Sequence, residues 1–547
     1  MSTWDYIVVG AGSSGCVVAN RLSQNAADRV LLLEAGPPAI ALMKVLGAAR
    51  YVDLTRYDWG YYSQPDPTRE LRRDRWLRGR CVGGTSSING TNYVRGSPAD
   101  YDRWAAIGNQ GWSASEVMPL FQSIERCTRG FDHGVDPLVR GLEGPLYIRQ
   151  TRHAHSLTEA FIQAACAAGF PRNVDYNSQS QEGVGLAQLN QRRGLRWSAA
   201  DAFLRPVLHR PNLRLITEAR VLRLIFDGSR VSGLCYEKDR RLQEVTAKRV
   251  ILCAGAINTP QLLMLSGVGD TEELNAVGIP VVLERKAVGR NLMEHPLVRV
   301  VCRTHERSYN PAGGLLHKAG LLAKFLFAGE GPLACVVEAQ AFLRTHAALA
   351  QPDIQLHFLP VGMGYALDNP YYVLPKPSFT VLINKSYPNS RGRIKLASAD
   401  PTAPPIIEPD MLREQADVAT LVSGIQTVRR ILAMKPMAAR VLEEVHPGRQ
   451  ASDGEALADY VRHHTEGAYH PAGTCRMGTD KEAVVGPDLR VKGLENLWIA
   501  DASIMPDLVS GNINAACMMI GEKLGRILTA ATATRRSQSG AETEVAV

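Results

Sequence analysis

Glycine spacing near the N-terminus predicts a phosphate-binding turn. The segment Gly10-Ala-Gly12-Ser-Ser-Gly15 follows a short apolar, β-branched run and precedes a helical pattern. In such a fingerprint Gly10 permits a tight turn, Gly12 lets the backbone approach a pyrophosphate, and Gly15 lets helix and strand pack closely. The helix N-terminus, which includes Ser13 and Ser14, offers backbone amides and a positive dipole end to the phosphates.

An acidic residue stands where the ribose of a dinucleotide is usually held. Glu34, followed by Ala35, ends the second apolar run, about 20 residues beyond Gly15. Its carboxylate would accept hydrogen bonds from the ribose hydroxyls, and it argues against a 2′-phosphate. The motif does not distinguish FAD from NAD. A glycine turn without a ligand is the alternative. However, the strand, the helix, the second strand and the acidic residue all occur in the order and at the spacing of a dinucleotide-binding unit.

Two polar residues near the C-terminal end could act on a substrate. His470 lies in the Gly/Pro-containing loop YHPAGT, ahead of an apolar strand pattern at 497–501. A histidine suits proton transfer at neutral pH, although one of 13 histidines taken at random is more often structural. Asn512 precedes a helical pattern from about 513 to 528. It could donate its amide to a substrate oxygen, cap the helix, or do both.

The elements that must position these residues predict an α/β fold. The first run, the helical pattern GCVVANRLSQ and the run RVLLLEAG form a βαβ unit, for which a parallel sheet is expected. The segment 60–100 is rich in Gly, Ser, Asn and Arg and reads as a long functional loop. Further strand patterns occur at 213–225, 231–237 and 248–254, and mixed strand and helix patterns occupy 299–445.

Size and composition describe a globular protein of more than one structural unit. A chain of 547 residues exceeds the size of one hydrophobic core. The net charge of +8 comes without a dense Lys/Arg block, which disfavours a nucleic-acid partner. Ten cysteines without a C-x-x-C pair indicate reduced thiols, and nothing resembles a metal site. Without a signal-peptide pattern or a membrane-length apolar stretch, we expect a cytoplasmic protein.

The segments 314–328 and 531–547 carry weaker signals. The first, LLHKAGLLAKFLFAG, predicts a helix that covers the substrate region. The alternative is a surface helix in weak peripheral contact with the inner face of the membrane. The second is polar and is expected to be a disordered tail.

Several other polar and aromatic residues allow two interpretations each. Tyr469, Tyr61 and Trp59 could line a pocket or pack in the core. His463 and His464 precede the YHPAGT loop and are expected to be solvated or structural. Glu338 could meet a cationic substrate, but an ordinary ion pair or hydrogen bond is the favoured interpretation.

Four further segments carry a family resemblance. They read RGRCVGGTSSINGTNYVRGSPADYD at 78–102, GAINTPQLLMLSGVG at 255–269, YHPAGTCRMG at 469–478 and NLWIADASIMPDLVSGNIN at 496–514. Together with the N-terminal fingerprint they resemble the glucose–methanol–choline (GMC) oxidoreductases, in order from about residue 4 to about residue 527. The closest similarity in appearance is to bacterial choline dehydrogenase-like and alcohol dehydrogenase-like members.

The resemblance implies an FAD enzyme with two domains. A Rossmann-like FAD-binding domain would comprise 1–300 and 460–530, with 60–100 as the flavin-contact loop. A substrate-binding domain, an antiparallel sheet with helices, would comprise 301–459 and part of 150–195. The FAD would be held without a covalent bond. Some members link flavin to a histidine at the position that matches Ile88, which has no nucleophile.

The resemblance also assigns roles to residues. His470 and Asn512 fall where the family keeps its catalytic pair. The residues implied for cofactor binding, by the resemblance or by the glycine motif, are Gly10, Gly12, Ser13, Ser14, Gly15, Glu34, Ala35, Gly83, Gly84, Thr85, Asn89, Gly90, Thr91, Asn92, Val221, Asp501, Ala502, Asn512, Ile513 and Asn514.

The implied reaction is oxidation of an alcohol to an aldehyde or ketone, with His470 as base and flavin N5 as hydride acceptor. A dehydrogenase that passes electrons to a quinone or another carrier is favoured over an oxidase that uses oxygen. A non-redox lyase or decarboxylase on the same scaffold is a further alternative, and a flavin protein without catalysis is disfavoured. No motif in the region of roughly 300–460 identifies the alcohol.

Overall fold

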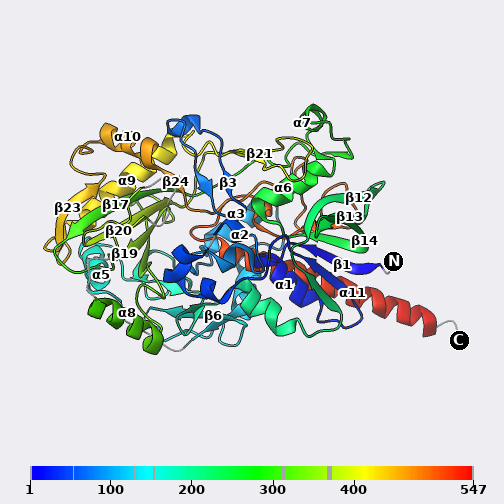
Figure 1. Ribbon diagram of the computed structural model, residues 1–547, viewed down its shortest axis with the longest axis horizontal. Coiled ribbons are helices and arrows are strands. Elements are labelled where there is room, and N and C mark those ends of the chain that lie inside the picture. The colour runs from blue at the N-terminus through cyan, green and yellow to red at the C-terminus, as the bar shows by residue number, and fades with distance from the viewer. Residues whose placement is uncertain are drawn as a thin grey trace.

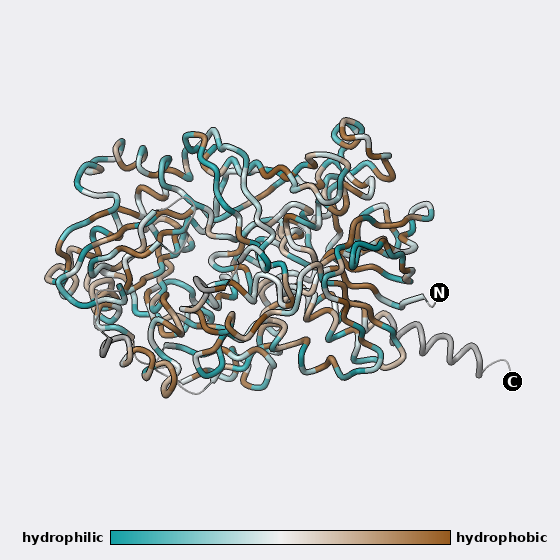
Figure 2. The backbone as a smooth tube through the Cα atoms, in the orientation of Figure 1, coloured by the Kyte–Doolittle hydropathy of each residue, from teal (hydrophilic) through white to brown (hydrophobic). Residues whose placement is uncertain are grey.

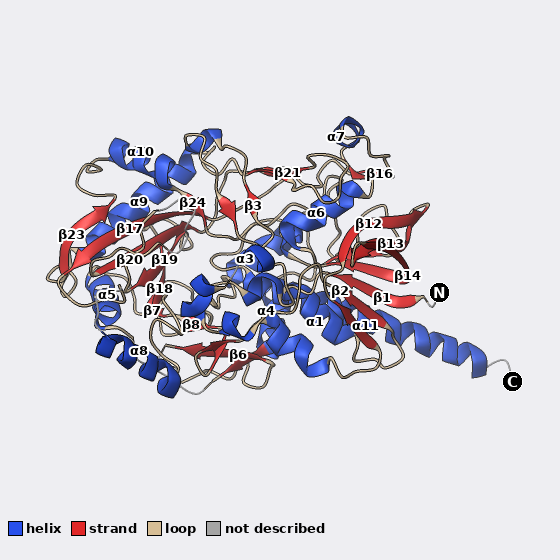
Figure 3. Ribbon diagram, in the orientation of Figure 1, coloured by secondary structure: helices blue, strands red, loops and turns tan. Residues whose placement is uncertain are grey.

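Two seven-stranded sheets form the two halves of the molecule (Figure 1). This computed structural model describes residues 3–52, 54–128, 131, 134–151, 154–310, 315–365 and 372–544. One sheet has a parallel centre and the other is antiparallel, with helices packed on both (Figure 3). The predicted α/β fold class is confirmed.

The first sheet is built around five parallel strands in the order β11 (Leu213–Ile216), β2 (Val30–Leu33), β1 (Trp4–Val9), β14 (Arg241–Leu252) and β25 (Leu497–Ile499). The strands β12 (Arg220–Asp227) and β13 (Arg230–Lys238) extend it beyond β14 as an antiparallel meander. The four residues of β2, the last four of β1 and the end of β14 (residues 250–252) are apolar and buried, as strand segments covered on both faces must be (Figure 2).

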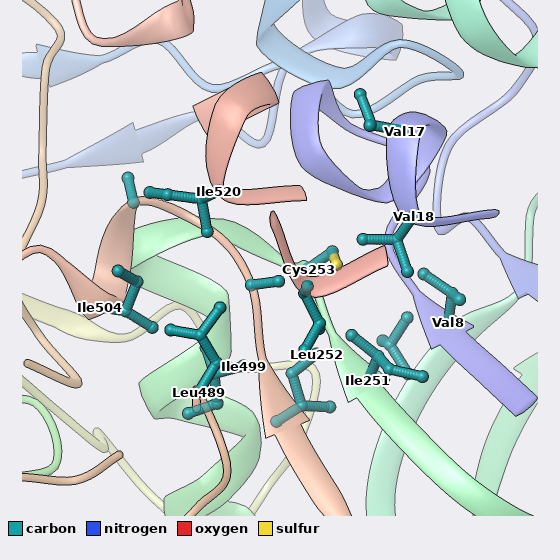
Figure 4. Close-up of a cluster of buried hydrophobic side chains, with 14 of the residues drawn as sticks. Val8, Val17, Val18, Ile251, Leu252, Cys253, Leu489, Ile499, Ile504 and Ile520 are labelled. Atoms are coloured by element: carbon teal, nitrogen blue, oxygen red, sulfur yellow. The ribbon is translucent and has the colours of Figure 1, made fainter. Parts of the chain in front are cut away.

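The core of this half joins chain segments from both ends of the sequence. In Figure 4 the side chains of Val8, Ile251 and Ile499 from three strands lie beside Val17 and Ile520 from two helices. These helices are α1 (Ser13–Leu22) and α11 (Asn514–Glu544). They approach closely because α11 carries a glycine where a Cβ would lie 2.7 Å from the carbonyl oxygen of Ser14. This packing fixes both helix N-termini beside the carboxyl ends of the strands.

The second sheet has the order β23 (Val441–His446), β17 (Pro296–Thr304), β20 (Ser378–Lys385), β19 (Ile354–Leu359), β18 (Ala339–Leu343) and β7 (Gly183–Leu186), with β24 (Glu466–Gly467) also paired to β17. Alternate residues, such as Leu356 and Val381, pack with α5 (Ser156–Ala167), α9 (Gln415–Leu432) and α10 (Gly454–His464). The residues between them point to the opposite face, toward the first half.

Shorter elements complete the chain. The helices are α2 (Leu54–Tyr57), α3 (Pro98–Ala106), α4 (Ala114–Ile124), α6 (Gly255–Leu265), α7 (Thr271–Ala276) and α8 (Leu315–Ala328). The strands are β3 (Tyr61–Tyr62), β4 (Arg75–Trp76), β5 (Glu125–Cys127), β6 (Leu146–Gln150), β8 (Gln188–Leu189), β9 (Gln191–Arg192), β10 (Leu195–Arg196), β15 (Val268–Gly269), β16 (Leu283–Glu284), β21 (Arg393–Lys395) and β22 (Ile406–Glu408). Within the described ranges, no helix is both long and apolar enough to cross a membrane.

Three expectations about elements differ from the structure. The predicted strand 213–225 is two strands, β11 and β12. The strand predicted at 248–254 begins earlier, at Arg241, because its exposed first half pairs with β13 in a hairpin. The tail 531–547 is helical as far as Glu544, since a helix that is already formed extends at little cost per residue. Residues 545–547 of that tail, and residue 314 of the predicted helix 314–328, lie outside the described residues.

Candidate functional site

A cavity of about 840 Å³ lies between the two halves. It is bounded by the carboxyl ends of β1 and β2, the N-termini of α1 and α11, and the inner face of the second sheet. Of the residues predicted for the site, all but two line this cavity: Gly10, Gly12, Ser13, Ser14, Glu34, Ala35, Gly84, Thr85, Asn89, Gly90, Thr91, Asn92, Val221, His470, Asp501, Ala502, Asn512, Ile513 and Asn514. The exceptions, Gly15 and Gly83, lie behind its wall.

The glycine turn forms a close-packed cradle. Gly10 has φ +97°, which L side chains rarely adopt. At Gly15 a Cβ would lie 1.9 Å from the carbonyl oxygen of Gly10, so this residue shapes the turn from behind. At Gly84 a Cβ would lie 2.7 Å from Cα of Gly12, so the two backbones meet. Gly83, with φ +95°, donates its N–H to the carbonyl of Ala11 at 2.7 Å.

Two helix N-termini open into the same cradle. The Ser13 hydroxyl donates to Oδ1 of Asn514 at 2.7 Å, and the Ser14 hydroxyl donates to the carbonyl of Cys517 at 2.7 Å. The first turns of α1 and α11 are thereby tied together. Their free amides and positive dipole ends suit the phosphates of a dinucleotide.

Glu34 lies where a ribose would be recognised. Its carboxylate accepts the N–H of Ala11 at 2.8 Å and the N–H of Gly36 at 2.9 Å. Burial raises the pKa of Glu34 to about 7, while these two amides act in the opposite direction. Each carboxylate oxygen accepts more than one hydrogen bond, so the group can still take a ligand hydroxyl.

The loop from Gly83 to Asn92 supplies another wall of the cavity. The side chain of Asn89 accepts the N–H of Thr91 at 3.0 Å and the Arg196 guanidinium at 2.8 Å. Thr91 has φ +61°, which the Asn89 contact helps to hold. Oδ1 of Asn92 is buried and has no protein partner. A bound ligand with a donor group would satisfy that oxygen, so this wall fits a cofactor.

Asp501 holds the third wall in place. Its carboxylate accepts the N–H of Gly255 at 2.9 Å, the Thr259 hydroxyl at 2.6 Å and the N–H of Ser503 at 2.8 Å. Asp501 therefore joins the end of β25 to the start of α6. Ala502 follows it into the cavity wall.

The two predicted catalytic residues touch each other. Nδ2 of Asn512 lies 3.1 Å from Nε2 of His470, and both side chains line the cavity. Oδ1 of Asn512 accepts the Gln355 amide at 3.2 Å, so the Asn512 side chain points to the second sheet rather than capping α11. The contact joins a loop before β25 to the residue that leads into α11, 42 positions later.

Sequence reasoning missed His295, which orients His470. Nδ1 of His295 lies 3.0 Å from Nδ1 of His470, and Nε2 of His295 lies 3.0 Å from the carbonyl of Ser386. A carbonyl only accepts, so the Nε2 of His295 must carry the hydrogen. Burial lowers the pKa of His295 to about 4, so the ring is neutral and its Nδ1 is an acceptor. His470 must then donate from Nδ1, which leaves the lone pair of its Nε2 directed at Asn512.

The backbone explains why these histidines meet. The loop with His470 pairs with the chain before β17: Met293 and Ala472 exchange two hydrogen bonds of 3.0 Å. The carboxylate of Glu294 accepts the N–H of His470 at 2.7 and 2.9 Å and the N–H of His295 at 3.0 Å. No local pattern signals this long-range pairing, so the sequence alone offered no indication of Glu294 or His295.

The surroundings of His470 favour its neutral form. Its pKa is held well below the ordinary value of 6.5, chiefly by burial and then by His295, His357 and Arg78. A neutral imidazole that carries its lone pair on Nε2 can accept a proton from a ligand hydroxyl that takes the place of the Asn512 amide.

The weaker sequence candidates separate into two groups. Tyr469 and Trp59 line the cavity, whereas Tyr61 does not and accepts a hydrogen bond from Asn258, which does. His464, on α10, stacks on Tyr460 with ring centroids 4.3 Å apart and is absent from the cavity lining. Within the described part of the chain, no group of three or more His, Cys, Asp or Glu side chains gathers as a metal site.

The orienting role of His295 leads to a prediction. If His470 is the base that the family resemblance implies, His295→Leu should slow the reaction by about 10–100-fold, the cost known for partners that orient metal-bound histidines. His295→Asn should recover much of that loss, because an amide oxygen can accept from Nδ1 of His470. The measurement is the rate of anaerobic cofactor reduction across pH. Equal losses in both variants would show that His295 acts only through packing.

Comparison with known proteins gives matches along nearly the whole chain. Two family models, both described as GMC oxidoreductase, match residues 4–297 and 388–521. The alcohol dehydrogenase [acceptor] of Pseudomonas putida is 39% identical over 536 residues, covering 96% of this chain and 95% of that protein. The mitochondrial choline dehydrogenase of Mus musculus is 38% identical over 541 residues, covering 96% and 89%. The crystal structure of pyridoxine 4-oxidase from Mesorbium loti superposes with a TM-score of 0.86 at 32% identity, covering 96% of this chain and 99% of that one.

Proposed function

We propose, from the premise that this chain belongs to the GMC oxidoreductase family, that it oxidises the carbinol group of an alcohol with His470 as the proton acceptor. The chain is an FAD-dependent oxidoreductase of the kind that acts on CH–OH groups. The observation that carries the finer proposal is the contact of His470 Nε2 with Asn512 Nδ2 inside the cavity that contains the dinucleotide cradle.

The pair provides both hydrogen bonds that an alcohol hydroxyl needs. The hydroxyl would donate to the Nε2 lone pair of His470 and accept from the Asn512 amide, replacing the present contact between the two side chains. The proton would be held at Nε2, while the Nδ1–H of His470 stays on His295. The Asn512 donor stabilises the negative charge that develops on the oxygen. FAD supplies the hydride acceptor when bound.

The low pKa of His470 bears on the order of events. An alcohol is far less acidic than an imidazolium, so complete transfer of the proton before carbon–hydrogen cleavage would be steeply uphill. We therefore propose that His470 takes the proton as the hydride leaves. The neutral imidazole is available over the whole neutral pH range because burial disfavours its protonated form.

We propose that FAD is held without a covalent bond. The position at which some family members attach flavin is Ile88, whose side chain lines the cavity and has no nucleophile. Acid precipitation of the purified yellow protein should release the flavin into the supernatant as FAD. Flavin that stays with the denatured pellet after exhaustive washing would contradict this proposal.

For the electron acceptor, we propose a quinone or a similar carrier rather than oxygen. The support for an apolar carrier is α8, where Leu321 and Leu322 line the cavity while Leu326 and Phe327 face solvent. The name of the relative from Pseudomonas putida, alcohol dehydrogenase [acceptor], leaves the chemistry of the acceptor open. We also propose that the exposed side chains of Leu326 and Phe327 contact the membrane surface when the protein binds it peripherally. A quinone analogue should support turnover much faster than air. Hydrogen peroxide formed one for one with oxidised alcohol would instead identify an oxidase.

A further inference from the structure

Beyond the catalytic pair, the cavity wall on the side of the second sheet is hydrocarbon. Leu297 of β17, Leu359 of β19 and Leu382 of β20 project from the inner face of the sheet, and Val361 and Met363 continue this wall after β19. Leu297, Leu359 and Val361 are buried, and Leu382 is half-buried. An alcohol bound at His470 would place its carbon substituent against this wall.

The carboxylates of the cavity are already engaged in hydrogen bonds or ion pairs. Among the described residues that line it, the acids are Glu34, Asp501 and Glu466. The first two hold backbone amides and a hydroxyl in the cofactor cradle, as described above. Glu466 pairs with the Arg299 guanidinium and, at 2.9 Å, with Arg72. None of the three is left to balance the charge of a cationic substrate.

Glu338, which the sequence raised as a partner for a cation, is used elsewhere. Its carboxylate accepts the Tyr309 hydroxyl, the N–H of His155 and the Thr158 hydroxyl, each at 2.7 Å. It is also absent from the cavity lining. The ordinary hydrogen-bonded interpretation of Glu338 therefore holds.

Two further polar residues on this wall are uncharged, because burial lowers the pKa of His357 to about 4 and Asn384 is an amide. His357 and Asn384 line the cavity side by side, with Nε2 of His357 3.3 Å from Nδ2 of Asn384. Nδ1 of His357 and Oδ1 of Asn384 are buried without a protein partner. These atoms suit a water or a neutral polar group of a ligand. They provide no negative charge, and Arg78 in the same cavity is positive.

We propose that the substrate is an uncharged alcohol whose carbinol carbon carries a hydrocarbon chain or ring, and that choline is disfavoured. This inference rests on the proposed function. A quaternary ammonium would lose its hydration in the cavity without meeting a free carboxylate, whereas a hydrocarbon gains from burial on the same wall.

A comparison of choline with its neutral carbon isostere, 3,3-dimethylbutan-1-ol, isolates the effect of charge, because the two alcohols have the same shape. The rate of anaerobic flavin reduction at limiting substrate should be at least about 100-fold higher for the isostere. Across a series of straight-chain primary alcohols, the same rate should rise about fourfold per added methylene, until the chain is long enough to cover the apolar wall. Calorimetry on the His470→Ala holoenzyme should show the same preference in binding.

The outcomes distinguish this inference from the proposed function. Faster reduction by choline than by the isostere would overturn the inference and leave alcohol oxidation intact. No reduction by any alcohol in the series would contradict the proposed function itself.

A variant pair tests the wall directly. Leu382→Glu places a carboxylate beside His357, while Leu382→Gln has the same shape without the charge. The ratio of choline to isostere reactivity should rise at least about tenfold in Leu382→Glu alone. An unchanged ratio in a Leu382→Glu protein that retains its flavin would show that the substituent does not contact this wall.

Discussion

His470→Ala is expected to slow flavin reduction by alcohol by about 10²–10⁴-fold, the usual contribution of a positioned base. The protein should still fold and retain FAD, because the glycine turn and the loop from Gly83 to Asn92 do not depend on this side chain. Anaerobic stopped-flow measurement of the visible flavin absorbance gives the rate. The matched control is His463→Ala, an exposed histidine on α10, which should reduce its flavin at the wild-type rate.

The pH dependence gives a second test of the same residue. Because the pKa of His470 is lowered, its neutral form persists as the pH falls through 6.5, and the rate should decline only in more acidic solution. The His470→Ala variant should lack that decline. A wild-type rate that falls through pH 6.5 to 7 would indicate a histidine with an ordinary pKa, and hence a different base.

Asn512→Ala should slow reduction by about 10²–10³-fold, because it removes the donor to the developing negative charge on the substrate oxygen. Asn512→Asp is the matched comparison: it keeps the shape and an oxygen for the Gln355 amide but lacks the N–H₂ donor. It should be impaired as severely as Asn512→Ala. A fully active Asn512→Asp would mean that the side chain only positions Gln355.

The double variant shows whether the two residues act on one atom. The losses from His470→Ala and Asn512→Ala should not add, since both side chains are proposed to contact the same hydroxyl. If the fold reduction in the rate of the double variant equals the product of the two single-variant reductions, the two residues act independently of each other. The comparison uses the same stopped-flow assay.

The parts of the site that follow from local sequence were predictable. Gly10, Gly12 and Glu34 form a pattern set by one βαβ unit, whose geometry is fixed by neighbouring residues. The loop residues and the pair His470 and Asn512 came from the family resemblance, and the structure places that pair in contact. Their roles stay predictions until the variants are measured.

What was missed depends on contacts between distant segments. His295 reaches His470 through pairing of chain segments 175 positions apart, and no local spacing encodes that pairing. His357 and Asn384 share the inner face of a sheet whose register cannot be read from either strand alone. The early start of β14 likewise depends on its hairpin partner, β13.

The most direct test of the central claim is to mix the FAD-loaded protein with a hydrocarbon alcohol in the absence of oxygen. The visible absorbance of the flavin should bleach in a single turnover, with one aldehyde or ketone formed per flavin. Flavin that stays oxidised with every alcohol tested would contradict the claim. Product formed without bleaching would contradict it too, and would point to the non-redox lyase alternative.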